Sequence, residues 1–117
     1  MIDDKALELG RLLGQSEEYR TLVRVTDRLK ADPECQRLIG DVERLAQAIE
    51  RSAQAGQEPT KEQVEQYERA LQAAQGSAVY QQVVAAQTNF DKLMAKVNAR
   101  IYEGIKKGAA SPIITLS

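Results

Sequence analysis

The chain has 117 residues, of which 43% are hydrophobic and 28% are charged, and these proportions fit one small domain with an apolar core. The formal net charge of −1 argues against a general polyanion binder, because phosphate contacts require a surplus of lysine and arginine on one face. The sequence has no histidine, which excludes catalytic Ser–His and Cys–His pairs and histidine-ligated zinc sites. We therefore expect a chain that is not an enzyme and that carries no metal and no cofactor.

No run of apolar residues is long enough to span a bilayer. The opening sequence, MIDDKALELG, lacks the basic and then apolar pattern of a secretory signal. The single cysteine, Cys35, excludes an intrachain disulfide, and without a signal sequence the expected compartment is the reducing cytoplasm.

Two short amphipathic helices are expected in the first 31 residues. The first covers residues 3–14, with two aspartates in its first turn and Gly14 at its end. The second follows Ser16, an N-cap candidate, and continues to about Ala31. The pair Asp32-Pro33 then ends it, because proline disfavours helical geometry in the preceding residue and fits the first position of a new helix.

A longer helix is expected from Pro33 to about Ala55. Its apolar residues form a short heptad-like seam at spacings of four, three and four: Leu38, Val42, Leu45 and Ile49. The turn QAGQEP follows, and the pattern from Thr60 to Gln63 matches a capping box that starts the next helix. Gly76-Ser77 then either bends or breaks this helix, so residues 61–107 form one kinked helix or two.

The longest amphipathic pattern runs from Ser77 to Lys107, and the rest of the chain is organised around it. We expect the seam of the preceding long helix to pack antiparallel against its first part. Its last third then remains to be covered by the N-terminal helices or by a second copy of the chain. The partner or dimer surface predicted there consists of Met94, Val97, Asn98, Ile101 and Ile105.

These elements predict an all-α fold: two short N-terminal helices followed by a long antiparallel helical hairpin with coiled-coil-like packing. Residues 1–108 form a single helical domain, and residues 109–117 form a short C-terminal tail that is either disordered or docked on a groove. The sequence predicts a homodimer or a higher homo-oligomer, because a chain of this size can hardly cover the long apolar stripe alone.

A basic stripe is formed by Arg20, Arg24 and Arg28, which recur every four residues on the second helix. The stripe could contact RNA phosphates or an acidic partner, and the alternative is a solvated face paired to Glu17 and Asp27. No aromatic residue lies between these arginines to stack on a base, which weakens the RNA hypothesis.

Three further features have a structural and a functional interpretation. Cys35 lies in the first turn of a helix and is either a reactive thiol or a small, half-buried apolar residue. Asn98 either fixes the register of an association or is an ordinary surface residue. The glutamates at positions 62, 65 and 68 share a face, but the di-iron bundles that use this spacing also need histidine.

Several short motifs together resemble the YlbF/YmcA family of small bacterial helical proteins, including its YheA-like branch. They span nearly the whole chain in this order: Ser16-Glu17-Glu18-Tyr19, Asp32-Pro33-Glu34 with Leu38-Ile39, Val79-Tyr80, Ala85-Ala86-Gln87, Phe90-Asp91-Lys92-Leu93-Met94 and Val97-Asn98-Ala99-Arg100-Ile101.

The resemblance implies a cytoplasmic, regulatory protein that self-associates, typically as a dimer. Some members of the family modulate the endoribonuclease RNase Y and so affect competence, sporulation and biofilm formation, which makes RNase Y and paralogous helical proteins the expected partners. Other features of these members include a cysteine-rich tail associated with an iron–sulfur cluster. The tail GAASPIITLS has no cysteine, so an iron–sulfur role is not expected here.

Overall fold

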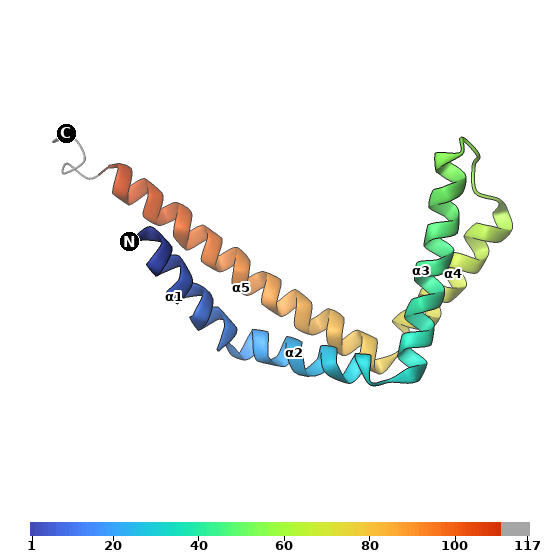
Figure 1. The fold of residues 1–117 in the computed structure, drawn as a ribbon, viewed down its shortest axis with the longest axis horizontal. Coiled ribbons are helices and arrows are strands. Elements are labelled where there is room, and N and C mark those ends of the chain that lie inside the picture. Colours follow the sequence, from blue (N-terminus) through green and yellow to red (C-terminus); the bar gives the residue numbers. More distant parts are fainter. Residues whose placement is uncertain (111–117) are drawn as a thin grey trace.

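The computed structural model describes residues 1–110, which fold into five α-helices and no strand (Figure 1). The all-α fold class is therefore confirmed. The tail prediction falls mainly on residues 111–117, which lie outside the described part of the chain. The helices are α1 (Ile2–Gly14), α2 (Glu17–Lys30), α3 (Pro33–Gln54), α4 (Lys61–Gln75) and α5 (Ala78–Ala109).

Side-chain caps set the starts of four helices. The side-chain oxygens of Ser16, Asp32, Thr60 and Ser77 each accept a hydrogen bond from the backbone N–H three residues on, at 3.2, 2.9, 3.1 and 3.3 Å. At Thr60 the capping box is complete, because the N3 side chain also accepts from the Thr60 N–H at 3.0 Å. The cap at Ser77 separates α4 from α5, so residues 61–107 form two helices.

The five helices form two arms that meet at an elbow (Figure 1). One arm contains α1, α2 and α5, and the other is the α3–α4 hairpin. Hydrogen bonds across the two helix junctions hold the elbow: Gln36 Nε2 donates to the Leu29 carbonyl at 3.1 Å, and Gln81 Nε2 donates to the Gln75 carbonyl at 2.7 Å. The molecule is consequently elongated, with principal extents of 67 × 37 × 19 Å.

Helices α2 and α5 pack antiparallel in the first arm. Near the elbow, Arg28 donates to the Gln82 side chain at 3.1 Å. Further from the elbow, the rings of Tyr19 and Phe90 lie 5.4 Å apart in a tilted arrangement. Arg28 near the end of α2 thus lies beside Gln82 near the start of α5, and Tyr19 near the start of α2 lies beside Phe90. From these contacts, α2 covers approximately the first half of α5.

The predicted packing of the α3 seam on the long helix is wrong. The seam residues are half-buried, but α3 packs on α4, and the extensive cover of α5 comes from α2. The loop of residues 55–60 explains this difference, because a short connection with Gly56 at φ 77° lets α3 and α4 pair as sequence neighbours. The α2 and α5 helices then leave the same end of this inner hairpin and run side by side (Figure 1).

The core is very small. Within the described residues, four side chains are buried: Val25, Cys35, Ala74 and Ala86. The radius of gyration is 21.5 Å, whereas a compact domain of this length has about 13 Å. The accessible surface is 9195 Å², against roughly 6,300 Å² expected for a folded monomer of this mass. An isolated chain thus leaves an unusually large surface in contact with water.

Candidate interaction surface

The predicted partner surface lies on the half of α5 that α2 does not cover. Met94 and Val97 are half-buried, while Asn98 is exposed, and Ile101 and Ile105 keep 46% and 58% of their surface accessible. The structure thus brings the five residues together on one helix and leaves two large aliphatic side chains in water. Large contiguous apolar patches on a protein surface mark binding sites, whereas apolar residues that are exposed singly are ordinary.

Helix α1 lies beside this half of α5 but covers it only loosely (Figure 1). A shallow groove of about 370 Å³ separates the two helices and is lined by Leu9 on one side and Val97 and Ile101 on the other. No residue of α1 is buried, and Leu7 and Leu12 are among the exposed large apolar residues. Both α1 and the end of α5 therefore have apolar side chains that the packing within this arm leaves exposed.

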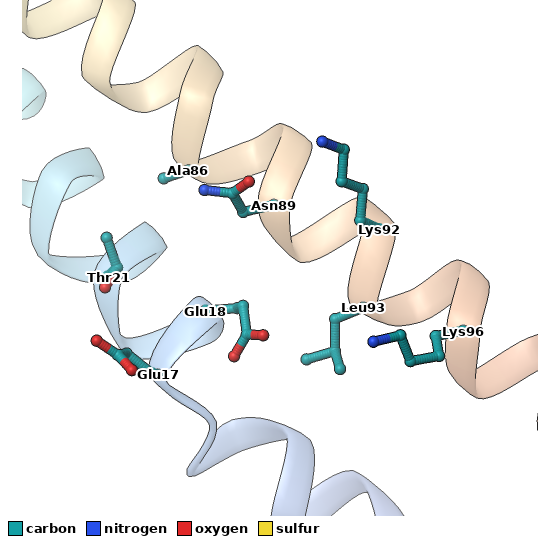
Figure 2. A pocket seen from close by; sticks show the side chains of 8 residues that line it. All are labelled: Glu17, Glu18, Thr21, Ala86, Asn89, Lys92, Leu93 and Lys96. Carbon is teal, nitrogen blue, oxygen red and sulfur yellow. The ribbon is translucent and has the colours of Figure 1, made fainter.

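A second groove, of about 430 Å³, opens between the start of α2 and the middle of α5 (Figure 2). Glu18 and Lys96 project into the space between the two helices, on either side of Leu93. Glu17, Thr21 and Asn89 add polar groups to the walls. The groove thus holds both signs of charge, with carboxylates from α2 and lysines from α5.

The arginine stripe is exposed along α2. Arg28 bonds to Gln82 on α5, and within the described residues no ion pair involves Arg20, Arg24 or Arg28. The alternative interpretation, a solvated face paired to Glu17 and Asp27, is therefore supported here only as a solvated face, since the ion pairs are not found in this part of the chain. The stripe remains a set of solvated cations at helical spacing.

Cys35 lies in the elbow, not on a reactive surface. Its side chain is 2% exposed, and the Ser77 hydroxyl donates to the sulfur at a distance of 3.6 Å. Asp32 accepts from the Cys35 backbone N–H. The thiol thus fills the junction between the two arms, which fits the interpretation as a small apolar residue, although it is more completely buried than expected.

Sequence reasoning did not single out Tyr102 or the exposed leucines of α1 as surface residues. Tyr102 is exposed and follows Ile101 directly, so it falls outside the three- and four-residue spacing that defines the apolar stripe of α5. Within residues 1–110, no group of three or more His, Cys, Asp or Glu side chains is arranged to hold a metal ion. None of the described helices is long and apolar enough to cross a membrane.

Comparisons with known proteins agree with this architecture. A UPF0342 protein of Bacillus licheniformis is 24% identical over 111 residues, covering 95% of each chain, and one of Bacillus pumilus is 27% identical over 109 residues, covering 93% of this chain and 92% of the relative. A solved structure, a protein of unknown function (DUF964) from Bacillus stearothermophilus, has a TM-score of 0.69 at 17% identity, over 95% of this chain and 97% of the other, and therefore shares the fold. Residues 2–106 match the family described as control of competence regulator ComK, YlbF/YmcA, and the chain belongs to this family.

Proposed function

We propose that the chain is a non-enzymatic, cytoplasmic regulatory protein that self-associates and acts by binding other proteins. The observation that carries the proposal is the uncovered half of α5, where Met94, Val97, Asn98, Ile101 and Ile105 continue the apolar stripe beyond the reach of α2. With four buried side chains among residues 1–110, a monomer has little core there to offset the conformational entropy lost on folding, so covering this stripe would also stabilise the helices.

Sedimentation velocity at micromolar concentration tests self-association directly. The chain has a mass of 13.0 kDa, and the expected result is a species of about twice that mass or more that dissociates on dilution. A single 13.0 kDa species across the whole concentration range would contradict this part of the proposal.

We further propose that the regulated process is RNase Y-dependent RNA processing, of the kind that controls competence, sporulation and biofilm formation. The family description, control of competence regulator ComK, supports a regulatory role of this type. The test is co-sedimentation of the purified chain with purified RNase Y, alone and with a paralogous helical protein. Ile105→Ser should weaken a complex formed through the α5 surface, whereas Val64→Ser on α4 should leave it unchanged. If the chain does not shift the sedimentation of RNase Y in either mixture, this assignment is wrong.

A second candidate function is RNA binding through Arg20, Arg24 and Arg28, because these exposed cations have no ion-pair partner in the described part of the chain. Fluorescence anisotropy with a labelled single-stranded RNA should then show affinity that falls steeply with salt. Arg24→Glu should abolish binding, while Arg51→Glu on α3 is the matched charge reversal outside the stripe. Undetectable binding at low salt would eliminate this function.

A further inference from the structure

Helix α5 carries a second stripe beside the one that contacts α2. Positions at alternating steps of four and three lie on one face of a helix, rotated by about 90° from the face that holds Ala86 and Phe90. This second face is only half-buried or exposed along its whole length, and its members are Tyr80, Val84, Gln87, Asp91, Met94, Asn98, Ile101 and Ile105.

We infer that this face binds the same face of a second copy, with the two α5 helices antiparallel around a two-fold axis between Lys92 and Leu93. The inference rests on the self-association proposed above and specifies its geometry. In this register Tyr80 lies opposite Ile105, Val84 opposite Ile101, Gln87 opposite Asn98 and Asp91 opposite Met94. Three of the four pairs thus match in character, apolar at both ends and amide opposite amide further in, while at the centre Asp91 of each copy lies opposite Met94 of the other.

The ends of the stripe have complementary shapes. A hollow of about 380 Å³ lies at the elbow end, where its lining includes Tyr80, Val84 and Gln75. Val84 is 46% exposed there, the same fraction as Ile101 at the other end. Antiparallel pairing places the protruding Ile101 and Ile105 of each copy against this hollow in the other, so that the exposed apolar residues of both ends are covered together.

Gln87 and Asn98, which pair in this register, have complementary amide groups. The Gln87 amide donates to Asp91 at 2.9 Å and retains its carbonyl oxygen as an acceptor. Asn98 of a second copy, opposite Gln87 in this register, has an amide donor for that oxygen. This contact gives Asn98 the register-setting role that buried polar residues have in coiled coils.

Charge favours the antiparallel arrangement over the parallel one. The segment from Lys92 to Ala109 has five basic residues and one acidic residue, and the α3–α4 arm with its junctions, residues 32–76, has nine acidic and five basic residues. A parallel pair would place the two basic ends together and Asp91 against Asp91. The antiparallel pair separates the basic ends and brings each one to the elbow of the other copy, where the acidic arm begins.

Cysteine cross-linking tests this register. A Val84→Cys/Ile101→Cys variant should form a covalent dimer under mild oxidation, whereas each single variant should not, because the two copies of position 84 lie about 25 Å apart along the axis. A disulfide within one chain is excluded, since both positions lie on one continuous helix. The native Cys35 is buried, and the wild-type chain is the control for its contribution.

The outcomes separate the register from self-association. Cross-linking of either single variant overturns the antiparallel register and leaves self-association standing. The same conclusion follows if the wild type dimerises but the double variant does not cross-link. A wild-type monomer in sedimentation overturns both. Charge complementation is an independent check in which Val84→Glu and Ile101→Lys each weaken the dimer at least tenfold and the double variant restores it. Failure of the double variant to restore the dimer, with helicity preserved by circular dichroism, also overturns the register.

Discussion

Replacing Ile101 with serine should weaken self-association without harming the fold of the monomer. Fully burying an isoleucine side chain contributes about 2 kcal/mol, and 46% of Ile101 remains to be buried by a partner, so each copy should lose roughly 1 kcal/mol. A symmetric dimer contains the residue twice, which gives roughly 2 kcal/mol and a dimer dissociation constant raised about 30-fold. Sedimentation equilibrium over a concentration series measures this change.

The matched control is Val64→Ser on α4, which removes an apolar side chain that is 37% exposed and lies on the other arm. This variant should dimerise like the wild type, and both variants should retain their helical circular dichroism. Equal dissociation constants for Ile101→Ser and the wild type would refute the reasoning. Equal weakening by the two serine variants would do so as well, because it would place the contact elsewhere or make it nonspecific.

Three further predictions concern the fold itself. Thr60→Ala removes the capping box of α4 and should cost about 1 kcal/mol, measured by urea denaturation, whereas Thr88→Ala, exposed in the interior of α5, should cost much less. Val25→Ala deletes two buried carbons and should cost roughly 2 kcal/mol, and Val23→Ala on the exposed side of α2 provides the comparison. The hydrogen bond and charge of Arg37 lower the pKa of Glu34 below its ordinary value of 4.5. The stabilising effect of this Glu34–Arg37 pair is therefore present above the ordinary pKa and is lost as the pH falls through the lowered pKa. Carboxyl titration by NMR should show that the pKa shift of Glu34 vanishes in Arg37→Gln.

The helix boundaries could be predicted because their signals are local. Ser16, Asp32, Thr60 and Ser77 each hold a cap that depends on a few neighbouring residues, and all four lie where a helix begins. The sequence leaves the break at Gly76-Ser77 open because a helix can bend through such a pair, and the Ser77 cap decides it. The predicted pattern ends at Lys107, but α5 continues through Gly108 to Ala109, since glycine weakens a helix without ending it.

The pairing of the helices could not be predicted in the same way. The α3 seam and the apolar face of α2, which holds Leu22, Val25 and Leu29, consist of similar aliphatic residues with helical spacing. Either could therefore cover α5 by pattern alone. The choice depends on chain connectivity: the six-residue turn around Gly56 connects α3 and α4 as a hairpin, and the two short junctions at its other end direct α2 and α5 away from it together. The predicted partner surface depends less on this pairing, because Ile101 and Ile105 lie beyond the part of α5 that α2 covers and keep 46% and 58% of their surface exposed.

The same geometry explains why the end of α5 is largely exposed in the described part of the chain. A helix of 32 residues is about 48 Å long, whereas α2 has 14 residues and covers less than half of it. The helix α1 continues along the remainder but buries none of its own residues. Among the described residues α3 adds no extensive cover, because it packs on α4 in the other arm. The elbow that gives the protein its elongated shape thus also leaves the second face of α5 exposed or half-buried within the described residues, which is the surface that the proposed dimer would cover.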